Sequence, residues 1–171
     1  LMLTAEDGAF AEGYWRSHGL PADRRQPVVA IHPGSGSAKK NWPVDRFAVV
    51  ARRLRDDLGL VPIFILGEAE EGIRDAIAGA ASGLALLERC ELLEVASVLA
   101  VCRGYVGNDS GITHLAAALG TPTVALFGPT DPAVWGPRGA NVRIVRAERG
   151  SMSGIDPEDV FECVLRLLRV S

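Results

Sequence analysis

Short apolar runs that do not alternate with polar residues recur along this chain, and stretches with apolar residues at helical spacing separate them. Continuously apolar strands are typical of a parallel sheet covered on both faces. Right-handed crossovers between such strands predict an α/β fold, a doubly wound parallel sheet of the Rossmann-like type. The runs are VVAI (28–31), VPIFIL (61–66), LALL (84–87), YV (105–106) and TVALF (123–127), with the alternating VRIV (142–145) as an edge strand. The helices expected between and after them begin near residues 43, 73, 92, 111 and 157.

The first 26 residues do not follow this pattern. We expect a helix across 6–18, and the charged stretch after Pro21 is typical of a linker. The chain is therefore divided into an N-terminal extension with linker (1–26) and a Rossmann-like domain (27–171). Because the first residue is Leu1, we also expect the chain to be a piece of a longer protein.

Composition excludes several classes of function. A formal charge of −3 over 171 residues, without a long basic run, argues against binding to nucleic acid. No apolar run approaches the roughly 18 residues that cross a bilayer. Three cysteines lie far apart without a CxxC pair, which indicates reduced thiols of a cytoplasmic protein. No cluster has metal-ligand spacing, so we predict neither a metal nor a cofactor.

Ligands of a doubly wound sheet bind where strands end and helices begin, so the loops there deserve most weight. The loop after the first strand, HPGSGSAKKNWP, offers small residues, hydroxyls and two ammonium groups. Gly34 and Gly36 would let the backbone approach a bulky anion such as a diphosphate. The alternative is a flexible polar loop. Since neither GxxxxGK[ST] nor GxGxxG is present, a P-loop kinase or an ordinary nicotinamide dehydrogenase is disfavoured.

The corner NDSG (108–111) opens a second helix beside that loop. Unpaired amides at a helix start, here at Ser110 and Gly111, favour a phosphate. Asp109 has the wrong charge for phosphate but suits sugar hydroxyls, and the alternative is that Asp109 only caps the helix. His114 follows in that helix, where a lone histidine is more often packed and hydrogen-bonded than a ligand. One of the carboxylates that follow Gly67 would suit a ribose diol.

Taken together, HPGSGSAKKNWP, GEAEEGIRDA, GNDSGITHLAAALGTPTVALFGPTDP and the following WGP resemble glycosyltransferase family 9, the ADP-heptose:lipopolysaccharide heptosyltransferases. The motifs occur in the family's order across residues 28–137. The resemblance implies the GT-B fold, with two Rossmann-like domains facing a cleft. This chain would be the C-terminal half, which holds most of the sugar donor.

The resemblance also implies roles for individual residues. Lys40, two residues before Trp-Pro, would contact the donor phosphates and stabilise the leaving group. Ser35, Gly36 and Ser37 would form the phosphate-side loop, and Glu70 would take the ribose hydroxyls.

At the corner, Asp109 would bind heptose hydroxyls and the amides of Ser110 and Gly111 the diphosphate. His114, inside the same motif, completes the predicted donor-binding residues, and the stretch around Cys90 would border the adenine.

The implied reaction is inverting transfer of heptose from ADP-heptose to the lipopolysaccharide core. The family's catalytic base lies in the N-terminal domain, and no residue here matches it. We therefore expect this chain to bind donor without transferring sugar, and the acceptor to bind through the other domain. Because the acceptor is membrane-bound, we expect a cytoplasmic protein that works at the inner face of the inner membrane.

Two alternatives remain open: a non-catalytic sugar-nucleotide-binding module, and a GT-B or epimerase relative that uses a UDP-sugar. The last helix carries many apolar residues. In a half-protein that surface would be exposed or covered by a second copy, so we expect a tendency to form a homodimer. The residues concerned are Val160, Phe161, Val164, Leu165, Leu167 and Leu168.

Overall fold

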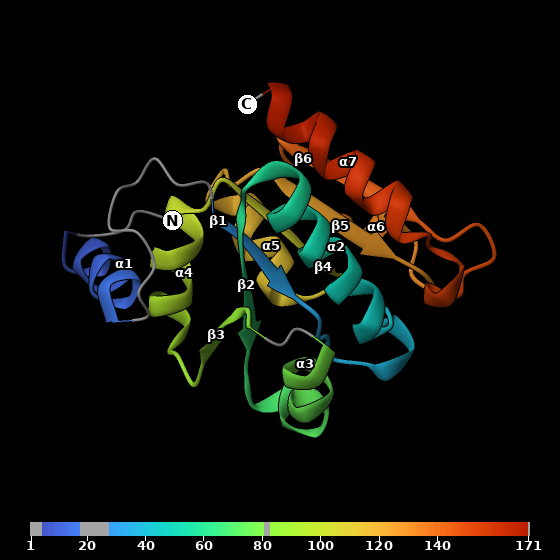
Figure 1. The fold of residues 1–171 in the computed structure, drawn as a ribbon. Helices are drawn as coiled ribbons and strands as arrows, with labels where there is room; N and C mark the ends of the chain where they lie inside the picture. The colour runs from blue at the N-terminus through green and yellow to red at the C-terminus, as the bar shows by residue number, and fades with distance from the viewer. Residues whose placement is uncertain (1–4, 18–27, 81–82, 171) are drawn as a thin grey trace.

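One parallel sheet organises the molecule. The computed structural model describes residues 5–17, 28–80 and 83–170 (Figure 1). Within these residues six strands pair in the order β3-β2-β1-β4-β5-β6, every pair parallel. This is the strand order of the Rossmann fold, so the predicted fold class is confirmed. The strands are β1 (Val28–His32), β2 (Val61–Leu66), β3 (Ala85–Glu88), β4 (Gly104–Asn108), β5 (Thr123–Phe127) and β6 (Val142–Arg146).

Helices cover both faces of the sheet (Figure 1). Successive strand residues point to opposite faces, so Val29 and Ile31 join a core under α2, α3 and α7, while Val28 and Ala30 join a core under α1, α4 and α5. The helices are α1 (Ala5–Ser17), α2 (Val44–Leu58), α3 (Arg74–Ala80), α4 (Leu92–Val101), α5 (Gly111–Ala118), α6 (Pro132–Trp135) and α7 (Pro157–Val170). Three 3-10 turns complete the described chain, η1 (Ala38–Lys40), η2 (Glu68–Ile73) and η3 (Met152–Gly154).

The expected elements are present at nearly the expected places. The strand 123–127 and the helix 92–101 agree residue for residue, and β6 is the expected edge strand. The short helix α6 and the 3-10 turn η2 were not predicted, because each lies in a loop without an apolar repeat. Helix α2 begins at Val44 with Pro43 as its N-cap, one position outside the first turn expected for that proline.

The N-terminal helix packs on the domain that follows it. Tyr14 and Ala11 are buried in the core shared with α4, and the Tyr14 hydroxyl donates to the carbonyl of Leu86 at 2.8 Å. The predicted helix 6–18 is thus found as α1, except that residue 18 lies outside the described residues. The linker expected after residue 21 also lies outside them, and the division at residues 26 and 27 stays a prediction.

The expectation of an exposed apolar surface on the last helix is wrong. Val160, Phe161 and Val164 are almost fully buried, because α7 folds back onto its own sheet beside α2 (Figure 1). The guanidinium of Arg53 lies 3.8 Å from the centre of the Phe161 ring and covers it. The apolar stripe that suggested a dimer belongs to the core of this chain, so the stated reason for a dimer is lost.

Candidate functional site

The two loops singled out in the sequence lie side by side at the carboxyl edge of the sheet. Strands β1 and β4 are direct neighbours, with His32 opposite Gly107 in the register. The chain leaves β1 toward β2 on one side, and leaves β4 toward β5 on the other. This point of reversal opens a crevice where ligands of Rossmann-like sheets bind.

Asn108 fastens the first loop at both ends. Its side-chain Nδ2 donates to the carbonyl of Pro33 at 2.7 Å, and its Oδ1 accepts from the backbone N–H of Trp42 at 3.1 Å. The residue is fully buried at the end of β4. Sequence reasoning missed this role, although an amide that both donates and accepts is the side chain suited to it.

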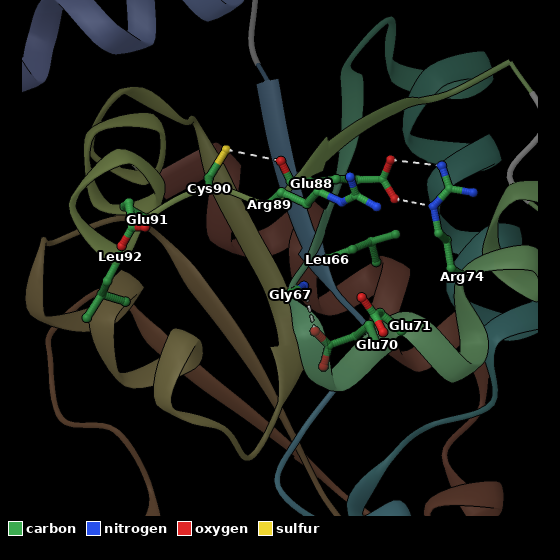
Figure 2. A pocket seen from close by; sticks show the side chains of 10 residues that line it. All are labelled: Leu66, Gly67, Glu70, Glu71, Arg74, Glu88, Arg89, Cys90, Glu91 and Leu92. Atoms are coloured by element: carbon green, nitrogen blue, oxygen red, sulfur yellow. Dashed lines mark hydrogen bonds and ion pairs between the residues drawn. The ribbon is translucent and has the colours of Figure 1, made fainter.

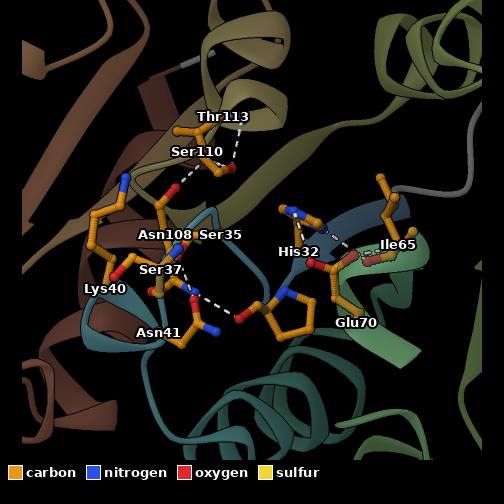
Figure 3. A network of polar contacts seen from close by, with 12 residues as sticks. His32, Ser35, Ser37, Lys40, Asn41, Ile65, Glu70, Asn108, Ser110 and Thr113 are labelled. Carbon is orange, nitrogen blue, oxygen red and sulfur yellow. Dashed lines mark hydrogen bonds and ion pairs between the residues drawn. The ribbon is translucent and has the colours of Figure 1, made fainter. Parts of the chain in front are cut away.

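Hydrogen bonds inside the loop give it a defined shape. The Ser35 hydroxyl lies 2.9 Å from the carbonyl oxygen of Ser37 and 2.5 Å from Oδ1 of Asn41 (Figure 3). The turn η1 follows, closed by the Lys40 N–H to the Ser37 carbonyl at 2.9 Å. In this structure the loop therefore has a defined, hydrogen-bonded conformation.

Lys40 and Asp109 meet across the two loops. The Lys40 ammonium lies 2.9 Å from the carbonyl oxygen of Asp109 and 3.2 Å from its Oδ2. A residue that sequence reasoning missed, Thr130, donates its hydroxyl to the same Oδ2 at 2.9 Å. The structure thus unites two predicted residues with a third from the turn after β5, and neighbouring Lys39 stays exposed.

The cap of α5 is Ser110 and not Asp109. The Ser110 hydroxyl accepts from the Thr113 N–H at 3.4 Å, as an N-cap side chain does. The Thr113 hydroxyl in turn bonds the carbonyl of Asn108 and lies 2.9 Å from the buried Tyr105 hydroxyl. The interpretation of Asp109 as only a helix cap is therefore wrong. Its carboxylate contacts Lys40 and Thr130 instead. The N–H groups of the first turn at Gly111 lack intrahelical partners, as at every helix start.

Glu70 is a buried carboxylate at the end of β2. Its Oε2 accepts from the Gly67 N–H at 2.7 Å, which caps η2, and its Oε1 lies 4.0 Å from Nε2 of His32 (Figure 3). A Cβ placed on Gly34 would lie 1.6 Å from that Oε1. Position 34 therefore has room for this carboxylate only without a side chain, and the approach of an anion to the Gly34 backbone stays a prediction.

His32 is buried, and burial favours the neutral form of its imidazole. Its Nδ1 lies 3.0 Å from the carbonyl oxygen of Ile65, which fixes the proton on that nitrogen. Burial lowers the pKa of His32, opposed by the Ile65 hydrogen bond and by the charge of Glu70. The histidine therefore stands between β2 and the first loop, as expected of a residue that orients that loop.

Two adjoining pockets run along this edge. One, of about 450 Å³, is lined by Ser35, Gly36, Glu70, Ser110 and Gly111 together with residues of β2 and α4. The structure thus gathers five of the nine predicted donor-binding residues around one cavity.

The second pocket, of about 700 Å³, extends from Glu70 to the turn after β3 (Figure 2). Both pockets share Cys90 and Leu92, so they form one continuous groove. A two-pronged ion pair between Arg74 and Glu88, at 2.6 and 3.0 Å, borders it.

The other four predicted residues, Ser37, Lys40, Asp109 and His114, line neither pocket. Lys40 and Asp109 meet next to Ser110, which lines the smaller pocket, whereas His114 is exposed on α5. The expectation of a packed, hydrogen-bonded histidine there is wrong. Among the described residues no group of three or more His, Cys, Asp or Glu side chains is placed to hold a metal ion. Nor is any described helix long and apolar enough to cross a membrane, and all three cysteines are free.

Comparison with known proteins gives one consistent result. The profile of glycosyltransferase family 9 (heptosyltransferase) matches residues 8–165. Lipopolysaccharide heptosyltransferase 1 of Escherichia coli K12 is 29% identical over 93% of this chain. The chain spans only 49% of that protein, and half or less of the other curated relatives it matches.

Solved structures agree in fold. A family 9 glycosyltransferase from Veillonella parvula superposes over 100% of this chain and 54% of its own, with a TM-score of 0.91 at 24% identity. The E. coli heptosyltransferase WaaC with ADP-2-deoxy-2-fluoro heptose gives a TM-score of 0.72 at 26% identity, over 91% of this chain and 47% of its own. The part of this chain that superposes includes the residues of the groove described above.

Proposed function

The chain belongs to glycosyltransferase family 9, and we propose that it is the C-terminal domain of a heptosyltransferase, where it binds the donor ADP-heptose. The observation that carries the proposal is the meeting of Lys40 and Asp109 beside a groove at the switch point of the sheet. A cation for phosphate and a carboxylate for sugar hydroxyls stand there side by side. The relative WaaC holds an ADP-sugar, which supports the choice of nucleotide.

The groove accommodates the parts of such a donor in sequence. The diphosphate lies at the start of α5, where the amides of Ser110 and Gly111 and the Lys40 ammonium supply positive charge. The sugar lies toward Asp109. The ribose lies toward Glu70, and the base enters the larger pocket near Cys90. Ser35 and Gly36 cover the phosphate side.

These groups support the departure of the nucleoside diphosphate. In an inverting transfer the acceptor hydroxyl attacks as the diphosphate leaves with its extra negative charge. Donors that are held in place before the reaction stabilise that charge without reorganisation. Lys40 and the helix amides fill this role, and no metal is assigned to it. The base that deprotonates the acceptor belongs to an N-terminal domain, so this chain alone binds donor and transfers no sugar.

The remaining expectations about the whole protein are also part of the proposal. The acceptor is the lipopolysaccharide core, held mainly by the N-terminal domain, and the enzyme acts at the cytoplasmic face of the inner membrane. The heptosyltransferase names of the relatives support this placement. A homodimer is not proposed, since the apolar face of α7 is buried.

Titration calorimetry with ADP and UDP tests the nucleotide and the phosphate contact together. We expect ADP to bind and UDP to bind far more weakly. Lys40→Ala should weaken ADP binding by about tenfold or more, because one charge-assisted contact is lost. Lys39→Ala is the matched control, because this neighbouring lysine is exposed.

Equal loss in both lysine variants would reduce the effect to net charge and contradict the assigned role of Lys40. Preference for UDP would favour a UDP-sugar enzyme or epimerase relative instead. Binding of neither nucleotide would contradict donor binding by this chain.

A further inference from the structure

Both side-chain partners of Asp109 converge on one of its two carboxylate oxygens. Lys40 Nζ lies 3.2 Å and Thr130 Oγ1 2.9 Å from Oδ2. No hydrogen bond to Oδ1 occurs among the described residues, and no buried side-chain oxygen in that part of the chain lacks a partner. Oδ1 is therefore open to solvent, although the residue as a whole is only 7% exposed.

In its present position Lys40 has only one N–H left for a diphosphate, because the other two have partners on Asp109. Its ammonium already has the carbonyl oxygen and Oδ2 of Asp109 as partners. An ammonium has three donors, so one is left for a phosphate oxygen, and a second contact to the diphosphate requires Lys40 to give up one of its bonds to Asp109. Asp109 would then lose its cation and keep the Thr130 hydroxyl as its side-chain partner.

Thr130 has no such second task, and its backbone is well held. It sits between β5 and α6, where Asp131 caps α6 by accepting from the Ala133 N–H at 3.2 Å. Asp131 also lies 3.4 Å from the guanidinium of Arg146 at the end of β6. On the other side, a Cβ on Gly128 would lie 2.5 Å from the sulfur of Met152, so this turn is packed closely.

We propose that Thr130 is a positioning residue for the donor sugar: its hydroxyl holds Oδ2 of Asp109 when Lys40 moves to the diphosphate, and so keeps Oδ1 turned toward the sugar hydroxyls. This rests on the proposed function, in which Asp109 binds the sugar. The ligand-free pair of Lys40 and Asp109 is then a resting state in which two binding groups neutralise each other. Thr130 acts only through Asp109 and does not itself contact the phosphates.

The test compares ADP with ADP-2-deoxy-2-fluoro heptose by titration calorimetry. The measured quantity is the dissociation constant of ADP divided by that of ADP-2-deoxy-2-fluoro heptose. This ratio isolates the contribution of the sugar to binding. Thr130→Val removes the hydroxyl at nearly constant shape and should reduce this ratio about tenfold, as expected for one hydrogen bond to a carboxylate. Thr130→Ser keeps the hydroxyl and should restore the ratio. Thr130→Ala provides a second loss of the hydroxyl if the valine variant folds poorly.

A double-mutant cycle with Asp109→Ala completes the experiment. Thr130→Val should change the ratio no further in the Asp109→Ala background. If Asp109→Ala lowers the ratio but Thr130→Val leaves it unchanged, the proposal for Thr130 is overturned and donor binding stands. It is also overturned if Thr130→Val weakens both ligands equally, since that is the result of a structural role. If Asp109→Ala itself leaves the ratio unchanged, the assigned role of Asp109 fails, and the role of Thr130 fails with it.

Discussion

At the scale of single residues, contacts between side chains give the site its shape. Asn108 joins the first loop to β4, and Glu70 fills the space that Gly34 leaves. The residues themselves pointed to Asp109 and to a pair of lysines, and the resemblance to glycosyltransferase family 9 selected Lys40 from that pair. The sequence did not predict Asn108 or Thr130, because an amide or hydroxyl has no distinctive pattern until the fold brings its partner near.

The buried histidine predicts how stability depends on pH. Burial lowers the pKa of His32, whereas an unfolded chain titrates it near 6.5. Below about pH 6.5 the unfolded state therefore binds more protons than the folded state, and the free energy of unfolding falls as pH falls. The loss from this residue is at most about 1.4 kcal/mol per pH unit, from pH 6.5 down to its folded pKa.

Urea denaturation between pH 7 and pH 5 measures this contribution. His32→Asn keeps a donor for the Ile65 carbonyl without the titration, so its stability should fall less steeply than that of the wild type. His114→Asn, a change at an exposed histidine, should keep the wild-type slope. Parallel slopes for wild type and His32→Asn would show that His32 is not the group responsible.

At the scale of elements, local pattern predicted the fold well and tertiary placement poorly. The strands were found because four of the six, β1, β2, β4 and β5, are buried on both faces or nearly so, which leaves continuous apolar runs. The last helix was also found, yet its partner was not. An apolar stripe on a helix indicates that one face is buried, but it does not say which element buries it. In α7 that face packs on the chain's own sheet and on α2.

Two leucines in α7 test this packing with one and the same substitution. Leu167 is 3% exposed in the core, whereas Leu165 is only partly buried. Leu167→Ala should reduce the free energy of unfolding by about 2–5 kcal/mol, because it leaves a cavity, and Leu165→Ala should cost clearly less. Urea denaturation of the two variants gives both values. The reverse order would mean that α7 turns a different face to the sheet.

At the scale of the whole molecule, the proposed function makes the site half of a larger one. The switch point between β1 and β4 gathers groups for a nucleotide-sugar, but no described residue was assigned as the base for the acceptor. The chain also spans about half of the heptosyltransferases that it resembles. We propose that a donor-binding half accounts for both facts, and the sequence suggested it because its ordered motifs resemble those of glycosyltransferase family 9.

The central claim, that this groove holds the donor, is tested most directly by a crystal structure of the chain with ADP bound. We predict the diphosphate at the amides of Ser110 and Gly111, the ribose beside Glu70, and Lys40 Nζ within hydrogen-bonding distance of a phosphate oxygen instead of Oδ2 of Asp109. ADP bound away from the carboxyl edge of β1 and β4, or bound there with Lys40 still on Asp109 and the phosphates out of its reach, would contradict the account.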